Sequence, residues 1–143
     1  MTDPTLRRLL VESFEVLRTD LPPSYGALCR RLDRLAIEIR VDGEGFVVRF
    51  SESRAGVADI SGSTDAHIET SVGCILAVID GAIDLSEAVM RHEVRVVGAL
   101  SVVTRLHEGI LAYVHGAVRC PAFPELLRRL RSLSGNREMG DRP

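Results

Sequence analysis

Apolar residues recur at helical spacing along the first part of the chain. Between Thr5 and Leu17 they follow one another at steps of three and four residues, which is typical of a helix that buries one face. Leu21-Pro-Pro-Ser interrupts this pattern, and a second amphipathic helix is predicted from Ser24 to Leu35. The chain is therefore expected to begin with two helices that each turn an apolar stripe toward a core.

From Leu35 onward the apolar positions recur every second residue. The alternation from Leu35 to Val41 predicts a strand with one buried face. Asp42-Gly43 is a hairpin turn signal, and Phe46 to Ser51 is predicted as the returning strand. Two further strands are expected at Arg54 to Ser61 and at Ala66 to Thr70. A β-meander is thus predicted to follow the helical N-terminus.

Helical spacing returns in the second half of the chain. Ser71 and Asp84 are typical N-cap residues, and each precedes an apolar run, Val72 to Ile79 and Leu85 to Arg91. Glu87 stands three positions after Asp84, which is the spacing of a capping box. Two short helices are therefore predicted here.

The last predicted elements are one strand and two helices. Glu93 to Gly98 alternates briefly and is predicted as a fifth strand, and Ala99 to Val114 has helical spacing. A final helix is expected from Glu125 to Leu133, with Pro124 in its first turn. Residues 134–143 have no apolar periodicity and are predicted to be disordered.

Together these elements predict one α+β domain, a five-stranded, mostly antiparallel sheet covered on one face by helices. A chain of 143 residues has the usual length of a single domain. We divide it into an N-terminal helical segment, 1–34, that packs on the core, a core domain, 35–133, and a tail, 134–143.

The composition excludes several classes of function. All 18 basic residues are Arg, and Lys is absent. A phosphate-binding P-loop and Schiff-base chemistry both need a Lys side chain, so these classes are excluded. The codon bias of a GC-rich bacterial genome is the simplest explanation of the missing Lys. The net charge of −2 lacks the broad basic field of a nucleic-acid-binding protein, so we expect no nucleic-acid partner.

The polar residues give no metal or catalytic signature. Cys29, Cys74 and Cys120 are far apart, and no two His residues have the spacing of ligands on one helix face. No Ser stands in a nucleophile elbow. We therefore expect no metal, no other cofactor and no catalytic residue. The polar N-terminus and the lack of an apolar run long enough to span a bilayer predict a cytoplasmic protein.

The unusual feature of the sequence is its aliphatic content. Val72 to Val89 places many branched aliphatic residues in two short helices, whereas aromatic residues make up only 4% of the chain. Aliphatic walls can pack densely, or they can enclose a cavity for an apolar ligand. The pattern alone favours the packed core, because protein interiors are normally close-packed.

The order of these elements resembles the sterol carrier protein type 2 family of lipid-binding domains. The resemblance is carried by the strand at Ala66, the helix entered through Ser71, the Asp80-Gly81 turn with the helix after it, the strand that closes on Gly98, and the helix that follows. The upstream meander fits as well, so the resemblance covers residues 35–114. His92 departs from the family, which often has a Gly at that turn. The resemblance implies an apolar cavity between the sheet and the helices.

We therefore expect the protein to bind and carry a hydrophobic small molecule, such as a lipid or a fatty acyl chain, without covalent chemistry. The residues expected to contact this ligand are Phe46, Val48, Phe50, Ile75, Ile79, Val89, Leu100, Val103 and Leu106.

Two alternatives remain open. One is an enzyme or accessory factor in lipid or polyketide-type natural-product biosynthesis, which would need acid–base help from His67, His92 or His107. The other is an interaction module with a packed interior, whose Arg-rich helices dock a partner. The sequence identifies neither the ligand nor the oligomeric state, and a homodimer stays open.

Overall fold

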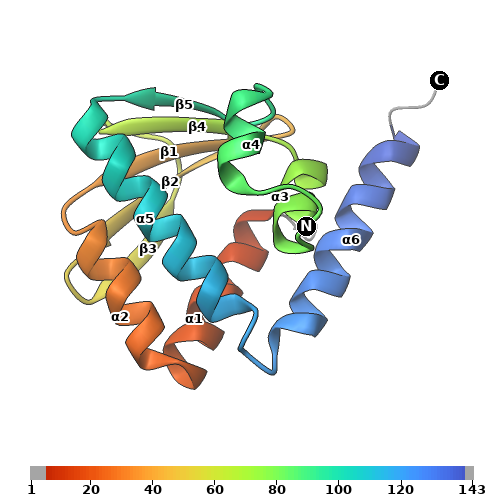
Figure 1. Cartoon of the computed structure of the whole chain (residues 1–143), viewed down its shortest axis with the longest axis horizontal. Helices are drawn as coiled ribbons and strands as arrows, with labels where there is room; N and C mark the ends of the chain where they lie inside the picture. Colours follow the sequence, from red (N-terminus) through yellow and green to blue (C-terminus); the bar gives the residue numbers. More distant parts are fainter. Residues whose placement is uncertain (1–5, 141–143) are drawn as a thin grey trace.

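A computed structural model describes the backbone of residues 6–140 and the side chains of residues 6–133. Within this range there are six helices and five strands (Figure 1). In chain order they are α1 (Leu6–Asp20), α2 (Pro22–Arg31), β1 (Ala36–Val41), β2 (Glu44–Ser51), β3 (Arg54–Ala58), β4 (Ala66–Thr70), α3 (Val72–Ile79), α4 (Leu85–Met90), β5 (Arg95–Gly98), α5 (Leu100–Ala117) and α6 (Phe123–Gly140).

The strands form one sheet in the order β3-β2-β1-β4-β5. The pairs β1–β2, β2–β3 and β4–β5 are antiparallel, and β1–β4 is parallel. The predicted five-stranded, mostly antiparallel sheet is therefore confirmed. The meander was predicted to continue through β4, which is wrong, because β4 lies on the other side of β1. Strand alternation does not reveal this choice of neighbour, since any strand edge offers the same backbone groups.

The helices cover one face of the sheet, as predicted (Figure 1). Along β1 the side chains of Ile37, Ile39 and Val41 point toward the helices, while Glu38 and Arg40 lie on the other face, where they form an ion pair. Because successive side chains of a strand point to opposite faces, this alternation gives the sheet one apolar face and one charged face. The apolar face positions the site.

Local signals fix several of the turns and helix ends. Asp42 and Gly43 have φ angles of 51° and 90°, as a tight hairpin between twisted strands requires. Ser71 Oγ accepts a hydrogen bond from the Cys74 backbone N–H, and Asp84 accepts one from Glu87. The predicted turn and both predicted N-caps are confirmed.

Some predicted boundaries were wrong. β3 ends at Ala58 instead of Ser61. The last helix begins at Phe123 and runs to Gly140, past Leu133. The backbone of residues 134–140, which was predicted to be disordered, is therefore helical, and residues 141–143 lie outside the described residues.

The N-terminal helices are integral to the core. Leu17 of α1 and Leu28 of α2 belong to the same buried cluster as Ile37 of β1. We therefore propose that the segment 1–34 and the core 35–133 fold as one unit, with residues 1–5 outside the described range.

Gly109 allows α5 to approach the end of α2 closely. A Cβ atom at this position would lie 2.7 Å from Leu32 Cδ1 and 2.8 Å from Leu32 Cγ, so the buried Leu32 side chain would have to shift. We expect Gly109→Ala to lower the free energy of unfolding by about 1–3 kcal/mol, the usual cost of overpacking, as measured by urea denaturation.

Gly73→Ala is the matched control. Gly73 is an exposed residue of α3, and the nearest atom to an added Cβ would be Ser71 Oγ at 3.9 Å. This substitution should be neutral or stabilise the fold by up to about 1 kcal/mol through helix propensity. Equal destabilisation by both variants would contradict the close approach at Gly109.

Candidate functional site

A cavity of about 260 Å³ lies between the apolar face of the sheet and the helices. All six helices and strands β1, β2 and β4 contribute to its wall. Nearly all the lining side chains are Leu, Ile, Val or Phe, and none of those described in residues 6–133 is charged. Ligand sites in proteins are typically concave and mostly apolar, as this one is.

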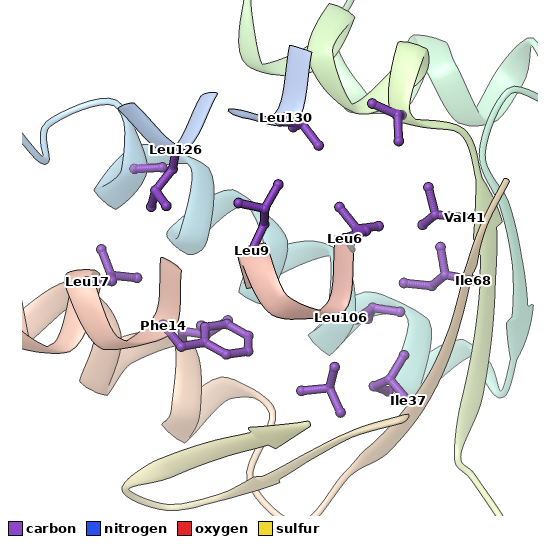
Figure 2. Close-up of a cluster of buried hydrophobic side chains, with 14 of the residues drawn as sticks. Leu6, Leu9, Phe14, Leu17, Ile37, Val41, Ile68, Leu106, Leu126 and Leu130 are labelled. Atoms are coloured by element: carbon purple, nitrogen blue, oxygen red, sulfur yellow. The ribbon is translucent and has the colours of Figure 1, made fainter. Parts of the chain in front are cut away.

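The sheet side of the cavity is formed mainly by two antiparallel strands. Phe46 and Val48 of β2 lie opposite Ile39 and Ile37 of β1, so their side chains share one face. Ile68 of β4, which is paired with Ile39, extends this face. Figure 2 shows several of these strand side chains pointing toward the same interior region as the helices above them.

The helix side depends on elements at both ends of the chain. In Figure 2, Leu6 and Leu9 of α1 and Leu126 and Leu130 of α6 approach the same region from above the sheet. All four side chains are buried and line the cavity. Two helices that are more than a hundred positions apart therefore close it together.

Six of the nine residues predicted to contact a ligand lie on this wall. They are Phe46, Val48, Phe50, Ile75, Ile79 and Leu106.

The structure does not place Val89, Leu100 or Val103 on the wall. Leu100 is 81% exposed, and Val89 is 39% exposed. Leu100 is the first residue of α5, directly after the edge strand β5, so it lies beyond the covered part of the sheet. Helical spacing predicts which face of a helix a side chain occupies. It does not predict which part of the helix length lies over the cavity.

Sequence reasoning missed the contribution of α1 and α6 to the wall. The amphipathic pattern of Thr5 to Leu17 did signal a buried face, but an apolar stripe does not say which surface it will cover. Tyr113 and Ser13, two polar residues of the wall, carried no distinct signal in the sequence.

Two ion pairs connect α6 to neighbouring helices. Arg129 donates hydrogen bonds to both carboxylate oxygens of Glu12 in α1. Arg131 donates to both oxygens of Asp80, the C-cap residue of α3, at 3.0 and 2.6 Å. The hydrogen bonds from Arg129 hold the pKa of Glu12 below its usual value, and those from Arg131 do the same for the pKa of Asp80. These bonds orient α6 over the cavity.

The histidines lie away from the cavity. His67 is on the charged face of the sheet, where its Nδ1 is 3.4 Å from Glu38 Oε2. His92 has a φ angle of 63° in the turn before β5 and is exposed. Across the described residues, no group of three or more His, Cys, Asp or Glu side chains is arranged to hold a metal ion. None of the described helices is long and apolar enough to cross a membrane.

A mixed five-stranded sheet with its helices on one face and an apolar cavity between the two layers defines a class of small α+β domains. No protein-family model matches the chain, and no curated protein sequence matches it either. Solved structures do match it, and the shared architecture is that of the sterol carrier protein 2 domain. The resemblance predicted from the sequence is therefore confirmed at the level of the fold.

Three of the structures with TM-scores above 0.5 show the extent of the likeness. A UbiJ-SCP2 ubiquinone synthesis protein has a TM-score of 0.57 and 19% identity, over 79% of this chain and 95% of its own. Sterol carrier protein domain 2 of Helicoverpa armigera has a TM-score of 0.54 and 13% identity, over 79% and 95%. A sterol carrier protein 2 has a TM-score of 0.52 and 13% identity, over 73% and 92%.

Arg129→Gln should loosen α6 over the cavity. An exposed ion pair contributes up to about 1 kcal/mol, so we expect two- to fivefold faster amide exchange in residues 123–133, measured by mass spectrometry. Arg128→Gln is the control, because Arg128 pairs with Glu125 within α6 itself and connects it to no other helix. The same increase in both variants would contradict a tethering role for Arg129.

The tether should weaken in acid. A carboxyl whose pKa is lowered by folding stabilises the fold above its unfolded pKa, and it loses this contribution as the pH falls through the lowered value. Because the pKa of Glu12 is lowered by Arg129, the difference in α6 protection between wild type and Arg129→Gln should be full at pH 7. It should shrink as the pH falls below about 4.3, the ordinary pKa of Glu, and disappear once Glu12 is protonated in both proteins, as amide exchange by NMR can measure. A difference independent of pH would mean that Glu12 is not the partner.

Proposed function

We propose that this protein binds a hydrophobic small molecule, such as a lipid or a fatty acyl chain, in the cavity and carries it through water. The cavity is the observation that supports the proposal: about 260 Å³ bounded by hydrocarbon side chains. Because protein interiors are normally close-packed, an apolar space of this size favours an occupant. The proposed contacts are Phe46, Val48, Phe50, Ile75, Ile79 and Leu106.

The wall chemistry favours hydrocarbon as the bound part of the ligand. Burial contributes about 25 cal/mol per Å² of apolar surface, and no described lining residue offers a charge to a carboxylate or a phosphate. A cavity of about 150 Å³ holds benzene, so a cavity of about 260 Å³ fits a chain of roughly eight to ten carbons.

The structural neighbours support the same class of ligand. Two of them are named as sterol carrier proteins and one as a ubiquinone synthesis protein. These names describe those proteins. For this chain they support an apolar ligand and do not select a sterol or a quinone.

The alternative functions have less support. An enzyme or accessory factor in lipid or polyketide-type biosynthesis would need an acid–base group at the ligand, and neither His67, His92 nor His107 lines the cavity. The interaction module requires a packed interior, which the cavity opposes. A cytoplasmic location and a homodimer stay predictions.

Native mass spectrometry of freshly purified protein tests the proposal. We expect a noncovalent adduct that denaturation releases and that has the mass of an apolar molecule. Protein freed of the adduct should bind 1-octanol, and it should speed the transfer of 1-decanol between vesicles without changing the mass of the alcohol. The absence of both an adduct and 1-octanol binding would contradict the proposal, whereas conversion of the alcohol would favour the enzyme.

Filling the cavity should block binding. Ile75 of α3 lines the cavity, so Ile75→Trp is expected to weaken 1-octanol binding at least about tenfold in calorimetric titration. Leu100→Trp makes the same kind of substitution at a side chain that is 81% exposed, and it should leave binding unchanged. Circular dichroism checks that both variants fold. Unchanged 1-octanol binding in folded Ile75→Trp would place the ligand outside this cavity.

A further inference from the structure

Two hydroxyl-bearing residues lie side by side in the hydrocarbon wall. Ser13 of α1 and Tyr113 of α5 both line the cavity, and Tyr113 Oη lies 2.6 Å from Ser13 Oγ. Ser13 Oγ in turn lies 2.7 Å from the carbonyl oxygen of Leu10. Both hydroxyls are therefore already hydrogen-bonded to the protein, in a chain that ends on a backbone carbonyl.

The direction of this chain follows from its last member. A carbonyl oxygen can only accept a hydrogen bond, so the Ser13 hydroxyl must donate to Leu10. With its only proton used, Ser13 must accept from Tyr113, and the Tyr113 proton is used as well. What remains at this point of the cavity is the acceptor capacity of the two oxygens.

We infer that Ser13 and Tyr113 form a binding site for the hydroxyl group of an alcohol, whose proton is donated to the Tyr113 oxygen. This inference rests on the proposed function and adds to it the polar group of the ligand. The hydrocarbon part of the alcohol lies against the aliphatic wall. A ketone, ester or ether has only acceptors and finds no free donor at this pair.

The surroundings of Ser13 and Tyr113 favour a ligand whose hydrogen-bond donor is uncharged. Tyr113 keeps accessible surface while it lines the cavity, so the ring borders the empty space. Burial raises the pKa of Tyr113 to about 12, so at pH 7 the phenol is neutral and donates its proton in the hydrogen bond to Ser13. A carboxylate would be buried here without a cation among the described lining residues, which is costly.

Three ligands of equal heavy-atom number test the inference by calorimetric titration: 1-octanol, 1-methoxyheptane and 2-octanone. We expect wild type to bind 1-octanol about three- to tenfold more tightly than the other two, the ratio that one neutral hydrogen bond supplies. Equal binding of all three would overturn the inference and leave the proposed function intact. Failure of all three to bind would instead contradict the proposed function.

Two variants separate the roles of the hydroxyls. Tyr113→Phe removes the Tyr113 oxygen and leaves only the Ser13 oxygen as an acceptor, so the preference for 1-octanol over 1-methoxyheptane should shrink. Ser13→Ala frees the Tyr113 proton, so the preference should shift from 1-octanol toward 2-octanone, whose carbonyl can accept it. An unchanged preference for 1-octanol in both variants would overturn the inference.

Thr70→Val is the control variant. Thr70 also lines the cavity, but its hydroxyl donates to the Glu93 carbonyl at an exposed position. The preference for 1-octanol should persist in this variant. Its loss in Thr70→Val alone would place the hydroxyl site at Thr70 and overturn the assignment to Tyr113.

Discussion

The apolar face of the sheet is the constraint on which the rest of the structure depends. This face carries side chains such as Ile37 of β1 and Phe46 of β2. Burying one side chain of this size stabilises the fold by about 1.5–3 kcal/mol relative to leaving it in water. The opposite face carries Glu38 and Arg40, so helices are needed on one side only. Helices from both ends of the chain cover the apolar face, and the cavity lies between these helices and the sheet.

Polar contacts at the rim set the position of the covering helices. The carboxylate of Glu44, at the start of β2, accepts hydrogen bonds from the backbone N–H groups of Leu6 and Arg7, which connects the first turn of α1 to the hairpin. A carboxylate at a helix N-terminus satisfies free donors and also favours the helix dipole. Glu12, further along α1, accepts hydrogen bonds from Arg129 of α6. The sheet therefore positions α1, and α1 positions α6.

The sequence predicted what local chemistry determines. β4 and α3 have their predicted bounds, because strand alternation and the cap at Ser71 act within a few residues. The pairing of β4 with β1 and the exposure of Leu100 depend on how helices and strands pack together. The spacing of apolar residues along the chain does not encode this packing. The same holds for the site: the β2 wall could be predicted from alternation, whereas the wall from α1 and α6 depends on contacts between the two ends of the chain.

The distribution of aromatic rings explains why such a cavity persists. The chain has four Phe, two Tyr and no Trp. Phe14, Tyr25, Tyr113 and Phe123 form one series of edge-to-face contacts, with centroids 5.9–6.4 Å apart, where α1, α2, α5 and the start of α6 meet. Four of the six aromatic rings thus pack against one another at the helix junction. Phe46 and Phe50 lie on the sheet side of the cavity, and the remaining lining residues are mainly Leu, Ile and Val. Because Tyr113 contacts two rings of this series, its ring is fixed. Its hydroxyl is therefore held at a constant position on the cavity wall.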